Sequence, residues 1–192
     1  MYKFICFLVK AFMSLIFRIK VNGSENIPSE GGFLLCSNHL SNWDPPLLQI
    51  CIKRRIRYMA KDELFHVPVL GAVLKGIKAI PVKRSGSDIT AIKTAIRTVK
   101  DGGVIGIFPT GQREKVKGEG EVKAGVGLLA VKTEVPVVPV YINAKYRIFS
   151  KVTVTIGKPQ LYCTEEGVKA TAQFLEDVSK EIYASIKKLD EV

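Results

Sequence analysis

Residues 32–46, which read GFLLCSNHLSNWDPP, carry the pattern that decides the fold class. The apolar run at the start of this stretch predicts a buried β-strand. An aspartate followed by two prolines predicts the start of a helix, with Asp44 as its N-cap and Pro45 in the first helical position. The stretch therefore predicts a strand that passes through a short polar loop into a helix.

The same alternation of strand and helix continues along the chain. One helix is predicted from Ser87 or Asp88 to the Gly102-Gly103 pair, and another over residues 165–189, which carry an apolar stripe. This order predicts an α/β fold, a single domain with a central mixed β-sheet flanked by helices. The predicted strands are residues 32–36, 56–59, 79–82, 104–108, 137–142 and 152–156.

The first twenty residues are predicted to be a separate element, a membrane-associating helix over 1–20 that precedes the domain spanning 21–192. Apolar side chains from Phe4 to Ile19 recur at helical spacing, and Lys10 falls on the opposite side. The uninterrupted apolar stretches are short for a membrane span. We therefore expect an amphipathic helix lying in the membrane interface. A buried or subunit-packing helix is the alternative.

The net charge of +11, from 29 basic and 18 acidic residues, favours an anionic partner. Nucleic acid, anionic lipid and a phosphorylated substrate all meet that description. No aromatic residues interleave with the cations to stack on bases, so nucleic acid is not expected. Two histidines and no paired cysteines argue against a metal site, and neither a phosphate-binding loop nor a dinucleotide fingerprint occurs, so no cofactor is expected.

His39 and Asp44 are the candidate reactive pair. A separation of five residues does not align two side chains on a helix, so the loop must fold back for the carboxylate to reach the imidazole. If it does, Asp44 can hold one ring nitrogen and leave the other as a general base. In the alternative interpretation, Asp44 only caps a helix and His39 packs at the end of the strand.

Four segments, in order along the chain, resemble the four motif blocks of the glycerolipid acyltransferase family, of the lysophosphatidate (1-acyl-glycerol-3-phosphate) type. The first is His39 with Asp44, and the second is residues 76–84, which end in Arg84. The third is residues 107–113, which contain Thr110-Gly111 and end in Arg113, and the fourth is the paired-proline run at 135–140. The segment around Lys61 is also similar to the family.

The resemblance implies an acyltransferase in which His39 and Asp44 are catalytic. The acyl donor would be acyl-CoA or acyl carrier protein, and the acceptor a lysophospholipid with a free hydroxyl, most simply 1-acylglycerol-3-phosphate. Such an enzyme would serve phospholipid biosynthesis on the cytoplasmic face of the cell membrane as a peripheral or monotopic protein. The acceptor phosphate would bind at Lys61, Arg84, Thr110, Gly111 and Arg113. For the two arginines, a surface ion pair is the alternative.

The third block departs from the family pattern. Thr110 stands where the family usually has a glutamate that is associated with acceptor binding, and Gln112 stands where it usually has a threonine. Another lysolipid or an amino-lipid is therefore an alternative acceptor, and a catalytically silent lipid-binding protein is an alternative function. A separate basic run at 53–57 is predicted to be either a solvated surface or a second contact with anionic lipid.

Overall fold

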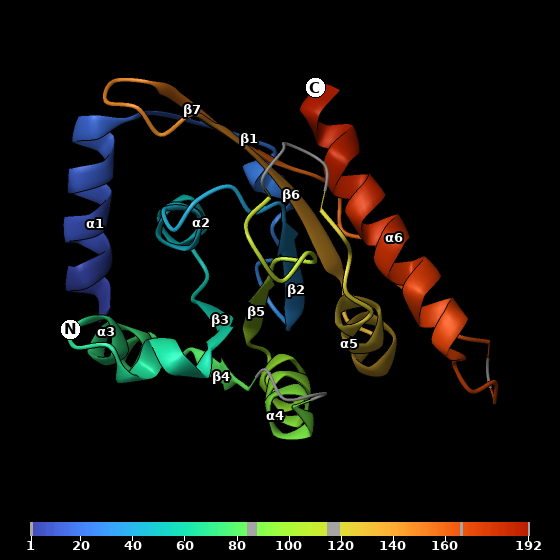
Figure 1. Ribbon diagram of the computed structural model, residues 1–192. Coiled ribbons are helices and arrows are strands. Elements are labelled where there is room, and N and C mark those ends of the chain that lie inside the picture. The colour runs from blue at the N-terminus through green and yellow to red at the C-terminus, as the bar shows by residue number, and fades with distance from the viewer. Residues whose placement is uncertain (1, 84–87, 115–119, 166, 192) are drawn as a thin grey trace.

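Seven strands form one mixed sheet in the computed structural model, which describes residues 2–83, 88–114, 120–165 and 167–191 (Figure 1). The strand order is β1-β7-β6-β2-β5-β3-β4. The strands are β1 (Arg18–Asn22), β2 (Phe33–Ser37), β3 (Ile56–Lys61), β4 (Ile80–Val82), β5 (Val104–Ile107), β6 (Val137–Ala144) and β7 (Lys151–Ile156). The α-helices are α1 (Tyr2–Ile16), α2 (Asp44–Cys51), α3 (Leu70–Gly76), α4 (Ile89–Lys100), α5 (Gly125–Thr133) and α6 (Ala172–Lys188). Short 3-10 turns cover Ser24–Asn26, Asp62–His66 and Leu189–Glu191.

The central strands of this sheet are parallel. β6, β2, β5, β3 and β4 run in one direction, and β7 joins β6 in antiparallel pairing. The carboxyl ends of five neighbouring strands therefore meet at one edge, where loops from distant parts of the chain can converge. The predicted α/β fold with a central mixed sheet is confirmed, and all six predicted strands are present.

Helices cover both faces of the sheet (Figure 1). Phe33 and Leu35 of β2 pack in the cluster beneath α1 and α2, whereas Leu34 and Cys36 pack in the cluster beneath α4, α5 and α6. A strand buried on both faces has no solvent-facing side, so polar residues do not alternate with apolar ones along it. This explains why its sequence is a continuous apolar run.

The strand β1 was missed by the sequence prediction, which continued the N-terminal helix through residue 20. The helix α1 ends at Ile16, and the Arg18 N–H then donates to the Ser150 carbonyl at 3.0 Å to begin the pairing with β7. Ile19 and Val21 are half-buried and alternate with the exposed Arg18 and Lys20. That period of two is typical of a strand with one covered face.

The other predicted helices form, with one shifted boundary. The Asp88 carboxylate caps α4 by accepting from the Ala91 N–H at 3.0 Å. The last helix, α6, begins later than residue 165, because the Thr171 hydroxyl caps it by accepting from the Phe174 N–H at 3.1 Å. Within the described parts of the chain, no helix is both long and apolar enough to cross a membrane.

Candidate active site

The loop between β2 and α2 folds back and brings His39 against Asp44. The His39 Nδ1 lies 2.7 Å from the Asp44 Oδ2. The same oxygen accepts from the N–H groups of Leu40 at 2.6 Å and Ser41 at 2.7 Å. The Asp44 side chain is fully buried and has no contact with water, so these donors supply the hydrogen bonds that water would give an exposed carboxylate.

The interpretation of Asp44 as a mere helix cap is wrong. The helix begins at Asp44 itself, the residue in the cap position is Trp43, and no side-chain cap hydrogen bond forms there. The Asp44 carboxylate points back to its own loop instead. The two prolines that follow occupy the first turn of the helix, where a missing N–H is tolerated.

Tyr146, in the loop between β6 and β7, is a residue of the candidate site that the sequence did not reveal. Its hydroxyl donates to the Asp44 Oδ1, and its ring packs edge-on against Phe17 at a centroid distance of 5.6 Å. Burial, and then the charge of Asp44, raise the pKa of Tyr146 well above its usual value, so the hydroxyl remains a donor. A separation of 102 residues from Asp44 left no local signal that could have identified it.

The His39 ring is held by stacking as well as by Asp44. It lies face to face with Phe108, at a centroid distance of 4.1 Å, and Tyr58 stacks on Phe108 at 6.1 Å. The His39 side chain is 16% exposed, and Nε2 makes no hydrogen bond to any residue that the structure describes. With Nδ1 donating to Asp44, Nε2 carries the lone pair and can accept a proton from a bound group.

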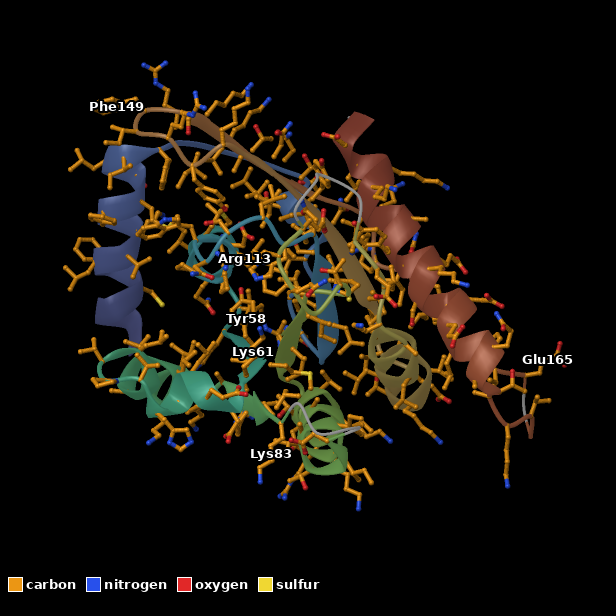
Figure 2. All side chains as sticks on the ribbon, in the orientation of Figure 1. Tyr58, Lys61, Lys83, Arg113, Phe149 and Glu165 are labelled. Atoms are coloured by element: carbon orange, nitrogen blue, oxygen red, sulfur yellow. The ribbon has the colours of Figure 1, made fainter. Side chains whose placement is uncertain are left out.

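Two of the predicted phosphate-binding cations reach the same edge of the sheet. Lys61 ends β3, and Arg113 follows the neighbouring strand β5 (Figure 2). The Glu114 N–H donates to the His39 carbonyl at 2.8 Å, so Arg113 adjoins the histidine loop. Both cations are exposed, and neither forms an ion pair with a residue in the described ranges. Arg84 lies outside the described residues.

Thr110 and Gly111 shape the turn that leads to Arg113. The Thr110 hydroxyl is buried and donates to the Gln112 carbonyl at 2.7 Å. The Gly111 N–H donates to the Phe108 carbonyl at 2.9 Å, and its φ of 64° lies in the left-handed region that glycine adopts readily. Both groups are therefore engaged within the turn.

The arginines in the basic run at 53–57 are hydrogen-bonded to the chain, whereas Lys53 is exposed. Arg54 donates to the carbonyls of Gly31 at 2.8 Å and Gly102 at 2.6 Å. Arg57 donates to the Lys78 carbonyl at 3.0 Å and the Thr98 hydroxyl at 2.8 Å. These arginines link loops to one another and to α4.

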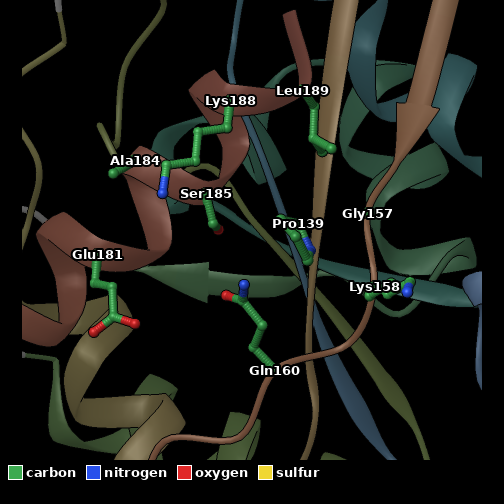
Figure 3. Close-up of a pocket in the computed structure, with 9 residues that line it drawn as sticks. All are labelled: Pro139, Gly157, Lys158, Gln160, Glu181, Ala184, Ser185, Lys188 and Leu189. Carbon is green, nitrogen blue, oxygen red and sulfur yellow. The ribbon is translucent and has the colours of Figure 1, made fainter. Parts of the chain in front are cut away.

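A groove of about 260 Å³ lies elsewhere, between α6 and the segment after β7 (Figure 3). Its lining includes Pro139, Gln160, Ser185 and Lys188, and none of the residues around His39. No three His, Cys, Asp or Glu side chains in the described ranges are grouped so that they could hold a metal ion.

A solved structure shares this fold. The crystal structure of the 1-acyl-sn-glycerophosphate (LPA) acyltransferase PlsC from Thermotoga maritima superimposes with a TM-score of 0.74 at 26% sequence identity. The match covers 98% of this chain and 80% of that one. The fold and the site therefore define an α/β enzyme of the acyltransferase class.

Sequence relatives point to the same class. A 1-acyl-sn-glycerol-3-phosphate acyltransferase of Bacillus subtilis is 38% identical over 141 residues, which are 72% of this chain and 69% of that protein. A chloroplastic enzyme of the same description from Brassica napus is 31% identical over 72% of this chain, but over only 42% of its own length. The family model Acyltransferase matches residues 18–143. The chain belongs to the Acyltransferase family.

Proposed function

We propose that the protein transfers a fatty acyl group from a thioester, acyl-CoA or acyl carrier protein, to the free hydroxyl of 1-acylglycerol-3-phosphate. The product would be phosphatidate, for phospholipid biosynthesis. The observation that carries this proposal is the His39 ring, whose Nδ1 is fixed 2.7 Å from Asp44 and whose Nε2 is left available. The Bacillus subtilis and Brassica napus relatives are both named 1-acyl-sn-glycerol-3-phosphate acyltransferases, which supports the choice of acceptor.

In this mechanism, His39 is the general base. Its Nε2 takes the proton of the acceptor hydroxyl while that oxygen attacks the thioester carbonyl, and the thiolate leaves as the new ester forms. Asp44 keeps the ring in the required tautomer and stabilises the imidazolium that develops. The proton then passes from His39 to the departing thiolate. No covalent acyl-enzyme is needed, because the acceptor oxygen attacks the thioester directly.

Arg113 and Lys61 would bind the acceptor phosphate, with Arg84 as a third cation that the family resemblance suggests. Arg113 adjoins the histidine loop through the Glu114–His39 hydrogen bond, so a phosphate held there would keep the rest of the acceptor near Nε2. A guanidinium can bind two phosphate oxygens at once, which an ammonium cannot do. Thr110 and Gly111 contribute by fixing the turn that presents Arg113.

We infer that α1, within the predicted segment 1–20, is the membrane-associating element and that the acyltransferase domain, which begins with β1, follows it. Met13 and Val9 pack toward the core, whereas Phe7, Leu8 and Leu15 are exposed. A helix with apolar side chains on its outer face is suited to the interface of a membrane. The site would then face the cytoplasmic leaflet, where anionic lipids attract a chain of net charge +11.

An acyl-transfer assay against a panel of lysolipids, with release of free thiol as the readout, tests the proposal. Turnover with 1-acylglycerol-3-phosphate, and its loss in His39→Ala, is the expected result. Turnover only with another lysolipid or an amino-lipid would assign a different acceptor to the same chemistry. Lipid binding without thiol release from any acceptor would indicate a catalytically silent relative.

A further inference from the structure

The loop between β6 and β7 ends in two exposed apolar side chains. Ile148 is 74% exposed and Phe149 is 67% exposed. Phe149 has a φ of 61°, in the left-handed region that large side chains rarely adopt. Backbone strain of this kind persists where surrounding contacts hold it, and it concentrates at functional sites.

Hydrogen bonds hold this loop tip in place. The Phe149 N–H donates to the carbonyl of Ile16, at the end of α1, at 2.7 Å. The Ser150 N–H donates to the Arg147 carbonyl at 2.9 Å, and the Ser150 hydroxyl accepts from the Arg147 N–H at 3.2 Å. The tip is therefore docked against α1 with its apolar side chains directed outward.

The tip extends the exposed apolar face of α1. Leu15, in the last turn of α1, is 76% exposed, and Phe149 lies at that end of the helix (Figure 2). Single exposed apolar residues are ordinary, but contiguous ones mark contact surfaces.

Five exposed cations lie on the tip loop and on the adjoining strands β1 and β7, and no carboxylate occurs near them in sequence. The segments 16–22 and 145–151 contain no Asp or Glu. Arg18 and Lys151 are direct partners in the β1–β7 pairing, an arrangement of like charges that destabilises a sheet. None of the five forms an ion pair with a described residue. The cations are Arg18, Lys20, Lys145, Arg147 and Lys151.

We propose that the Ile148–Phe149 tip is a second membrane contact, which enters the boundary between headgroups and acyl chains of an anionic leaflet. The five cations would bind the anionic lipid headgroups, and this binding would relieve the repulsion among the cations. This proposal rests on the membrane attachment proposed above and assigns part of it to a segment far from α1 in sequence. Because Tyr146 lies two residues before Ile148 and donates to Asp44, the contact would also place the candidate site beside the leaflet.

Flotation of the full chain with vesicles of phosphatidylcholine and phosphatidylserine tests this contact. The double variant Ile148→Glu/Phe149→Glu should bind about tenfold more weakly or worse, because apolar area is lost and two repelled charges are added. The matched control is Leu161→Glu, another exposed apolar position, which lies between β7 and α6 and should bind as wild type does. Equal flotation of the tip variant and wild type would overturn the proposal.

Charge variants separate the electrostatic part of the contact. Lys145→Gln/Arg147→Gln should weaken binding by about fivefold per charge, whereas Lys158→Gln/Lys169→Gln, at exposed lysines elsewhere, should have a smaller effect. Equal effects of the two pairs would mean that only net charge matters and would overturn the role of the tip cations.

Phe149→Gly distinguishes a contact residue from a structural one. Glycine accepts a φ of 61° without strain, so this variant should keep or raise the melting temperature while it weakens vesicle binding. Unchanged binding would contradict the proposal. Thiol release with a short-chain soluble acceptor should be normal in all tip variants. Absence of that activity in the wild-type protein would refute the proposed function and not the membrane contact.

Discussion

Two sets of charged side chains near the carboxyl ends of the strands differ in how many hydrogen-bond and ion-pair partners they have. The Asp44 carboxylate is buried and accepts from His39, from two backbone N–H groups and from Tyr146. Arg113 and Lys61 are exposed and have no ion-pair partner among the described residues. In the proposed mechanism, the Asp44–His39 pair is preorganised for proton transfer, whereas Arg113 and Lys61 present charge to a substrate that arrives from outside. The comparison predicts two kinds of kinetic defect.

His39→Ala should produce the largest defect. Loss of a positioned general base typically lowers turnover by roughly 10²–10⁴-fold. Every acceptor should be affected alike, because the base acts on the hydroxyl and not on the headgroup. His66→Ala is the control, since the other histidine lies exposed in the turn after β3 and should leave turnover unchanged. A folded His39→Ala protein with near-normal turnover would contradict the assignment.

Asp44→Asn should reduce turnover by about 10²-fold or more, because the amide removes the charge that stabilises the imidazolium and disturbs the tautomer. An amide oxygen can still accept from Leu40 and Ser41, so part of the loop structure should remain. Circular dichroism and the melting temperature separate the two effects. Inactivity that follows only from unfolding would indicate that Asp44 is structural.

Arg113→Lys should damage acceptor use rather than the chemical step. The substitution keeps the charge but loses the two-pronged contact with phosphate, which is worth about 1.5–3 kcal/mol, or roughly 10- to 150-fold in kcat/KM for the acceptor. The donor KM should change little. Arg97→Lys, at an exposed arginine of α4, is the matched control. A defect confined to donor saturation would assign Arg113 to the phosphates of the acyl donor.

Tyr146→Phe should produce the smallest defect, a decrease of about 5- to 10-fold in kcat with both KM values unchanged, because Asp44 keeps its three N–H donors. Tyr146 is a positioning residue in this account. The same substitution should therefore have no further effect in an Asp44→Asn background. Additive losses in the double variant would show that Tyr146 acts independently of Asp44.

Local patterns predicted much of the fold. Strand β2 was identifiable because both of its faces are buried, which leaves an uninterrupted apolar run. The start of α4 was identifiable because Asp88 caps it through a bond to a residue three positions away. The order of motif blocks then indicated the Acyltransferase family, which the matched residues 18–143 confirm.

Patterns that depend on distant partners were not predictable. Strand β1 exists because β7 offers it an edge, and its alternation is only two apolar residues long. The exposed and buried sides of α1 could not be separated by sequence, because apolar residues occur on both. The role of Arg54 also depends on carbonyls of remote loops.

The sequence by itself determined the α/β fold class and the strand-to-helix junction, because both follow from local periodicity and from the two prolines after Asp44. It also supplied the candidate pair His39 and Asp44, whereas the candidate phosphate-binding residues followed from the resemblance to the acyltransferase family. Only the tertiary structure decided that the Asp44 carboxylate turns away from its helix toward His39 and that the Tyr146 hydroxyl donates to its other oxygen. The physical reason is that a buried carboxylate must collect donors from wherever the fold brings them. One of those donors lies 102 residues away.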